Sequence, residues 1–220
     1  MLTRRLTDAL REGTHSLHQT AERTGIVAAI LAGTATRRGY ELLLCNLIDA
    51  YQALERSLDE HARCNPRHGV GRVALRALYR SPSLVADLAE LSGPDAIESL
   101  ERLPAGAAYA NRIYAVAGEH HGAALIGHAY VRYLGDLSGG QMLAARIANQ
   151  LGIDAAALSF YRFADIDNIG QFKTAYRDTI DQAGNECQAI DLIVAEACIA
   201  FEHNIQLAEA VSIAAARPER

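Results

Sequence analysis

The segment Tyr130–Gln141, YVRYLGDLSGGQ, places three glycines and one carboxylate inside a long helical pattern. A glycine inside a helix costs about 1 kcal/mol relative to alanine, so Gly135, Gly139 and Gly140 together weaken this helix by roughly 3 kcal/mol. Gly135 and Gly139 are one turn apart and form a bare backbone face. Such a face can receive a flat ligand, allow a bend, or pack closely against another helix. Asp136 brings a carboxylate to the same place.

Four polar residues form a second pattern near the N-terminus: Arg11, His15, His18 and Glu22. Their spacings of four, three and four residues place them in one stripe along a helix. A separate apolar stripe, about 100° away on the same helix, consists of Leu6, Leu10, Leu17 and Ala21. A single histidine beside an apolar face is more often structural than a metal ligand. His18, however, has a carboxylate one turn later at Glu22, and metal-binding imidazoles usually have such a partner.

Two further patterns bear on ligand binding. Glu12 and His15 match the Glu-x-x-His element of di-iron helical bundles, but the sequence contains no second such element, which argues against a di-iron site. Lys173 and Arg177 stand one turn apart and form a basic pair. Such a pair is commonly a solvated surface, but in a net-acidic protein it can also hold an anionic ligand near a cleft. Arginine in particular can bind both oxygens of a carboxylate.

The composition predicts an ordinary soluble, cytoplasmic protein. The length of 220 residues suits one domain with a substantial core, and 50% of the residues are hydrophobic. A net charge of −5 argues against nucleic-acid binding. The four cysteines lack metal-site spacing and are expected to be reduced thiols. The N-terminal segment has no signal-peptide core, and no apolar run is long enough to span a bilayer, so we expect no membrane association.

The helical periodicity predicts an all-α chain in which no proline falls inside a periodic segment. Helices are expected at about residues 3–23, 26–33, 36–62, 107–151, 167–183 and 185–215, with two or three shorter ones within 71–103. The helix over 107–151 is expected to bend near Gly118–Gly122 and again at the glycine cluster. We expect residues 1–220 to form a single domain, with a helical core to about residue 215 and a short disordered C-terminal tail.

These segments resemble the heme oxygenase family over nearly the entire chain. LREGTHSLHQTAE is similar to the family's proximal-helix segment, and YVRYLGDLSGGQ is similar to its distal-helix signature. FYRFADID, FKTAYRDTI and AFEHNIQLAEA are similar to its later segments. The resemblance implies a multi-helix bundle in which haem lies between a proximal helix and a kinked distal helix. It also implies that O2 and electrons are used to cleave haem to biliverdin, expected as the alpha isomer, with release of carbon monoxide and ferrous iron.

The resemblance also implies roles for individual residues. His18 would be the axial ligand of the haem iron, with Glu22 as its partner. Gly135 and Gly139 would let the distal helix approach the haem face and leave room for O2, while Asp136 would hold a distal water that supplies protons. The remaining haem contacts, to the propionates or along the pocket, are expected from Arg11, Tyr130, Gly140, Lys173, Arg177, Phe201 and Asn204, with Tyr51, Arg132 and Phe160 lining or supporting the pocket.

The chain also departs from its relatives. His15 stands where relatives often carry a lysine that faces the propionates, and it offers a second imidazole one turn from His18. Spacing alone therefore does not decide which histidine binds iron. Val27 and Ile30 are smaller than the residues common there in relatives. The hydrophobic tail of the mammalian type and the Cys-Pro haem-regulatory motif do not occur, which favours a soluble bacterial type of enzyme.

The resemblance implies an external electron donor, a ferredoxin or a flavoprotein reductase, and a monomeric enzyme. Two other functions remain as alternatives. A non-catalytic haem-binding or storage protein of the same fold would not need the carboxylate of Asp136. A protein of this fold with di-iron or thiamin-degrading chemistry should lack the joint pattern of His18 and GDLSGG.

Overall fold

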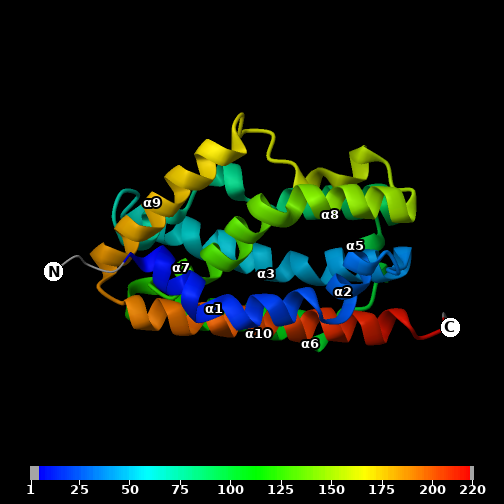
Figure 1. Cartoon of the computed structure of the whole chain (residues 1–220), viewed down its shortest axis with the longest axis horizontal. Helices are drawn as coiled ribbons and strands as arrows, with labels where there is room; N and C mark the ends of the chain where they lie inside the picture. The colour runs from blue at the N-terminus through cyan, green and yellow to red at the C-terminus, as the bar shows by residue number, and fades with distance from the viewer. Residues whose placement is uncertain (1–4, 219–220) are drawn as a thin grey trace.

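The computed structural model describes residues 5–218, and helices make up its regular structure, with no strand within that range (Figure 1). The longer helices are α1 (Leu6–Glu22), α2 (Gly25–Ala32), α3 (Arg37–Cys64), α4 (Ser81–Ser92), α6 (Pro104–Ala117), α8 (Gly135–Leu151), α9 (Ile169–Cys187) and α10 (Ile190–Ala215). Shorter pieces are α5 (Ala96–Ser99), α7 (Leu125–Ala129) and the 3-10 helices η1 (Gly69–Val73), η2 (Arg76–Leu78), η3 (His120–Gly122) and η5 (Ala155–Tyr161). The all-α prediction is therefore confirmed.

The segment expected as one bent helix over 107–151 is interrupted rather than bent at its first glycines. The helix α6 ends at Ala117, and α7 begins only at Leu125. Between them His120, His121 and Gly122 adopt left-handed backbone angles, with φ of 45°, 54° and 74°. A Cβ at Gly122 would overlap the imidazole of His61, so no other residue fits this turn without a rearrangement. The expected start of the first helix at Thr3 lies outside the described residues.

The second bend occurs one turn before the position expected from the glycines. Residues Tyr130–Leu134 form a π-helical turn, η4, that joins α7 to α8 without a loop. A π-turn inserts an extra residue into the helical repeat and often accompanies a functional site. It changes the direction in which the following residues point, and α8 then begins at Gly135.

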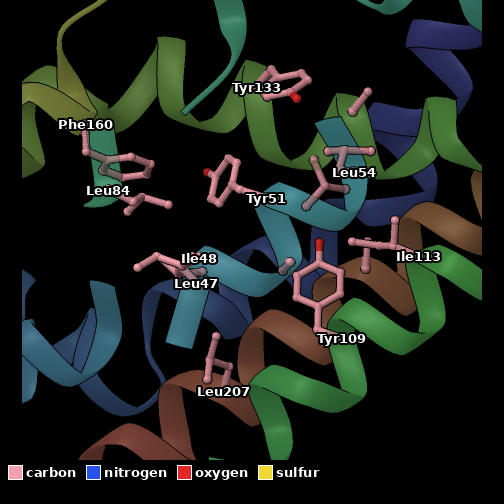
Figure 2. Close-up of a cluster of buried hydrophobic side chains, with 14 of the residues drawn as sticks. Leu47, Ile48, Tyr51, Leu54, Leu84, Tyr109, Ile113, Tyr133, Phe160 and Leu207 are labelled. Atoms are coloured by element: carbon pink, nitrogen blue, oxygen red, sulfur yellow. The ribbon is translucent and has the colours of Figure 1, made fainter. Parts of the chain in front are cut away.

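The helix α3 forms the centre of the bundle. It packs against α4, α6 and α10, while α1 lies along α10 (Figure 1). The α1–α10 contact is close, because a Cβ at Gly13 would lie only 2.6 Å from Cγ1 of Val194. Figure 2 shows how Tyr51 of α3, Tyr109 of α6 and Leu207 of α10 contribute to one apolar interior. This core holds the helices that carry the polar residues predicted to form a site.

A buried ionic cluster joins three of these helices. Glu196 of α10 accepts hydrogen bonds from Arg112 of α6 at 2.5 and 2.9 Å, and its Oε1 lies 2.9 Å from Nε2 of His128 in α7. Burial favours a higher pKa for Glu196, but the hydrogen bonds from His128 and Arg112 outweigh it and lower the pKa to about 2. Burial lowers the pKa of His128. The cluster therefore stabilises the fold through an ionised glutamate.

This arrangement predicts a specific loss of stability in acid. Because the folded state depresses the pKa of Glu196 from 4.5 to about 2, its contribution is present above pH 4.5 and is lost as the pH falls toward 2. Urea unfolding at pH 7 and pH 3 should show a large stability difference between the wild type and Glu196→Gln at pH 7 and a smaller one at pH 3. A difference that does not change with pH would contradict this role.

All four cysteines are free thiols, as expected. Within residues 5–218, no helix combines the length and the apolar character that a membrane crossing requires.

Candidate functional site

A cavity of about 950 Å³ lies between α1 and the η4–α8 segment. One wall is formed by Arg5, which precedes α1, and by residues of α1 itself: Thr7, Asp8, Arg11, Thr14, His15, His18, Ala21 and Glu22. The opposite wall is formed by residues of η4 and α8: Tyr130, Val131, Arg132, Leu134, Gly135, Asp136, Ser138, Gly139, Gly140, Met142 and Leu143. The two polar patterns predicted from the sequence therefore face one common space.

All four residues of the predicted polar stripe line the cavity on the α1 side. The side chain of His18 is 58% exposed, and its ring meets the edge of Phe201, with ring centroids 5.8 Å apart. Nδ1 of His18 lies 3.7 Å from Oε1 of Glu22, which is an ion-pair distance rather than a hydrogen bond. Nε2 of His15 lies 3.1 Å from Nε2 of Gln19. His18 is thus an accessible imidazole with a carboxylate beside it.

The glycines of the opposite wall differ from one another. A Cβ added to Gly135 or Gly139 would meet no atom within 4 Å beyond its own helix, so both positions open into free space. A Cβ at Gly140 would lie 3.3 Å from Cδ1 of Tyr161, so this glycine allows close packing against η5. The bare face predicted from the sequence is therefore formed by Gly135 and Gly139, and Gly140 serves packing as well as lining the cavity.

Asp136 belongs to a hydrogen-bond network that joins four segments. Oη of Tyr51, on α3, donates to Oδ2 of Asp136 at 2.5 Å. Arg132, on η4, donates from Nη2 to Oη of Tyr51 at 2.6 Å and from Nη1 to the side-chain oxygen of Asn204 on α10. Nη2 of Arg132 also lies 3.8 Å from Oδ1 of Asp136. Arg132 and Asp136 are four residues apart, and this helical spacing brings the guanidinium and the carboxylate to the same network.

The surroundings of Asp136 act on its ionisation in opposite directions. Burial raises the pKa of the carboxyl group, whereas the charge of Arg132 and the hydrogen bond from Tyr51 lower it, and the net change is upward. Burial also raises the pKa of Tyr51 well above its usual value. Tyr51 therefore remains a neutral donor. A carboxyl group with a raised pKa, held at the edge of a cavity, suits the transfer of protons to a bound ligand.

Cationic and phenolic side chains gather where α1 and α9 approach each other. Arg11, Tyr130 and Arg177 line the cavity, as does Arg5, which the sequence did not indicate. Lys173 is half-buried and is not part of the cavity lining. It stands one turn from Arg177 along α9, farther from the contact that α9 makes with α1 through Asp178 and Asp181.

The apolar wall of the cavity was largely missed by sequence reasoning. Besides the expected Phe160 and Phe201, and Val27, which the sequence analysis singled out, it contains Leu31, Leu43, Leu47, Met142, Leu143, Tyr161, Leu207 and Ala208. Leu43 and Leu47 follow ordinary core spacing on α3, and such spacing does not distinguish a side chain that faces the core from one that faces a ligand. Phe160 is held by a longer-range contact, because its backbone N–H donates to Asp87 of α4 at 2.7 Å.

Comparison with known proteins identifies the family of the chain. Residues 4–210 match the family model described as heme oxygenase. The chain belongs to the heme oxygenase family. It is 35% identical to heme oxygenase 1 of Nostoc sp. over 203 residues, which cover 92% of this chain and 84% of that protein. It is 36% identical to a heme oxygenase of Porphyra purpurea over 207 residues, covering 93% of this chain and 85% of that protein.

Solved structures of heme oxygenases share the fold. Heme oxygenase-1 of the cyanobacterium Synechocystis sp., solved in complex with heme, superposes with a TM-score of 0.89 at 32% identity over 96% of this chain and 94% of that one. The heme oxygenase of Leptospira interrogans superposes with a TM-score of 0.84 at 30% identity over 94% of this chain and 99% of that one. The family and fold expected from the sequence are therefore confirmed, and the chain is a haem-degrading enzyme of this family.

Proposed function

We propose that the cavity between α1 and α8 binds haem, with His18 on the iron and Asp136 on the opposite face, and that the enzyme cleaves the ring to biliverdin, carbon monoxide and ferrous iron. The observation that carries this proposal is the placement of His18, the bare glycine face and Asp136 around one cavity. A purely structural bundle requires none of these three features, and the family membership of the chain supports the same reaction.

The residues of the cavity fit haem in shape and polarity. Haem is a flat, largely apolar ring with two propionate carboxylates on one edge. The cavity offers an apolar interior, formed in part by Leu43, Leu47 and Leu207, and a rim that carries Arg11 and Arg177. Gly135 and Gly139 leave the distal backbone without side chains, so a flat ring can approach it closely.

The chain's own residues divide the work between the two faces. His18 supplies a neutral imidazole to the iron, which gives less electronic push toward O–O cleavage than a thiolate would. The neighbouring carboxylate of Glu22 orients this imidazole. Bound haem supplies the iron that activates O2 and the ring that is oxidised. On the other face, Asp136 holds a water and passes protons through it, while Tyr51 and Arg132 fix the orientation of the carboxylate.

Rotation of the ring within the pocket decides which ring position faces the distal carboxylate. Arg11, Tyr130 and Arg177 line the cavity and hold the propionates. Lys173, one turn before Arg177 on α9 and outside the cavity lining, adds positive charge beside them. Charged hydrogen bonds to carboxylates are both strong and directional. They fix one rotation of the haem, and we infer the alpha isomer of biliverdin as the main product.

The reaction also needs components that the chain does not itself supply. O2 is the oxidant, and electrons come from an external protein donor, either a ferredoxin or a flavoprotein reductase. We infer that the enzyme acts as a monomer.

Two substitutions at Gly139 test the bare glycine face: a small side chain should stabilise the apoprotein, and a large one should block haem binding. Gly139→Ala should stabilise the apoprotein by up to about 1 kcal/mol, because alanine is the better helix former and its Cβ meets no atom within 4 Å. Gly139→Phe should leave the apoprotein folded but strongly weaken haem binding, since the ring would occupy the cavity. Thermal unfolding and haemin titration measure the two effects.

Gly127, in the preceding helix α7, provides the matched control. A Cβ at Gly127 would lie 2.7 Å from the backbone oxygen of Ile193 and 2.9 Å from the backbone nitrogen of Ala197, so Gly127→Ala should destabilise the fold. If Gly139→Ala lowered stability as much as Gly127→Ala, the glycine face would be a packing surface rather than a ligand surface.

Haemin titration followed by turnover tests the proposed function. The purified protein is titrated with haemin, and a donor system is then added under air while absorbance and released carbon monoxide are recorded. Our proposal predicts one haem per chain and decay of the Soret band into a biliverdin spectrum. A Soret band that persists with a protein donor and also with ascorbate or peroxide would instead establish a haem carrier. A protein without a Soret band would not be a haem enzyme.

A further inference from the structure

The helix that carries His18 has no N-terminal cap from its own sequence. Its N-cap residue, Arg5, makes no side-chain cap hydrogen bond. The first backbone N–H groups of a helix lack partners within the helix. Here the backbone N–H of Thr7 donates to Oδ1 of Asp181 at 2.8 Å, and Oγ1 of Thr7 donates to Oδ2 at 3.1 Å. The cap of α1 is therefore supplied by α9, from 174 residues away.

Arg5 adds an ion pair to the same carboxylate. Its Nε donates to Oδ2 of Asp181 at 2.7 Å, and its Nη2 donates to Oδ1 of Asp178 at 2.6 Å. The two aspartates differ in environment, because the side chain of Asp181 is 11% exposed and that of Asp178 is 65% exposed. Charged hydrogen bonds contribute most when they are buried and multiple. Asp181, with three donors from α1 and its preceding residue, is thus the principal link between the two helices.

This link lies at the end of the cavity. Arg5 and Thr7 both line it, as does Arg177, one turn before Asp181 on α9. Elsewhere α1 packs mainly on α10. Asp181 therefore fixes the position of the helix that bears His18 relative to the helix that bears Arg177.

We propose that Asp181 is a positioning residue for the haem site. By capping α1 from α9, it holds the iron ligand and the propionate-binding arginine at the separation that one haem molecule requires. The same contact pairs two acidic side chains beside Arg177 with the guanidinium of Arg5, so that they do not repel anionic propionates. This inference rests on the proposed function, since it assumes that haem bridges α1 and α9.

The test compares Asp181→Ala and Asp181→Asn with the matched control Asp178→Ala. Asp178 binds the same arginine, whereas the hydrogen bonds of Thr7 go to Asp181. Haemin affinity is measured by titration, and hydrogen exchange at the first turn of α1 is measured in the apoprotein.

We expect Asp181→Ala to weaken haemin binding about tenfold, from loss of the cap and the charged hydrogen bonds, and to speed hydrogen exchange at the backbone N–H of Thr7. Asp178→Ala should stay within about twofold of the wild type, as exposed ion pairs do. Asp181→Asn should be intermediate, because its amide oxygen still accepts from Thr7.

Thermal unfolding separates positioning from general stabilisation. If Asp181 positions the haem site, the increase in Tm on adding haemin shrinks in Asp181→Ala and, to a lesser degree, in Asp181→Asn. Equal increases in the Asp181 variants and the wild type would overturn the proposal, as would unchanged exchange at Thr7. If Asp181→Ala does not fold, Asp181→Asn decides by the same criteria. If the wild-type protein did not bind haemin, the proposed function would be overturned. If the wild type bound haemin and the Asp181 variants bound it with the same affinity, only this inference would be overturned.

Discussion

Replacement of Asp136 with alanine is expected to leave haemin affinity close to that of the wild type while slowing biliverdin formation by about 10²–10⁴-fold, the range for loss of a positioned acid–base group. The carboxylate sits on the glycine side of the cavity, opposite His18, so its removal leaves the proposed iron ligand and propionate contacts in place. Haemin titration measures the first effect, and single-turnover absorbance under O2 measures the second.

Two further variants sharpen this prediction. Asp136→Asn retains the size of the side chain and can still accept the hydrogen bond from Tyr51. It therefore separates loss of proton transfer from the loss of side-chain volume that accompanies Asp136→Ala. Tyr51→Phe removes the donor but leaves the carboxylate, and should slow the reaction less than Asp136→Ala. Biliverdin formation at the wild-type rate in Asp136→Ala would refute the role of this residue in proton transfer.

Replacement of His18 with alanine is expected to abolish the native Soret spectrum and to weaken haem binding severely. His18 is the cavity-lining imidazole that has a carboxylate beside it and an aromatic ring against its edge. Removal of the His18 imidazole leaves a gap on the proximal side of the haem, which free imidazole can enter. Added imidazole should therefore restore a six-coordinate or five-coordinate imidazole spectrum in His18→Ala.

His15→Ala is the matched control, because His15 lines the same wall one turn earlier. It should keep the native spectrum and lose affinity only modestly, as expected for a residue near the propionates. If instead His15→Ala lost the native spectrum and His18→Ala kept it, the iron ligand would be His15, and the proximal assignment would be wrong.

The two walls of the site could be predicted from the sequence because each depends on local helical spacing. Arg11, His15, His18 and Glu22 follow from spacings of three and four residues, and all four line the cavity. The same arithmetic placed Gly135 and Gly139 on one open face. These features require only that the segments be helical.

Other features depend on contacts between distant segments and could not be predicted in this way. The π-turn at Tyr130–Leu134 and the left-handed turn before α7 arise where helices meet, and helical periodicity does not register an inserted residue. The apolar wall on α3 follows the same spacing as ordinary core. The cap on α1 comes from Asp181, while the residue at its own N-cap position is an arginine that gives no capping signal.

A crystal structure of the haem complex tests the central claim most directly. We expect the iron to be bonded to a ring nitrogen of His18, the opposite haem face to lie against the backbone of Gly135 and Gly139, and the propionates to contact Arg11 and Arg177. Haem bound outside this cavity, or an iron held by a residue other than His18, would contradict it.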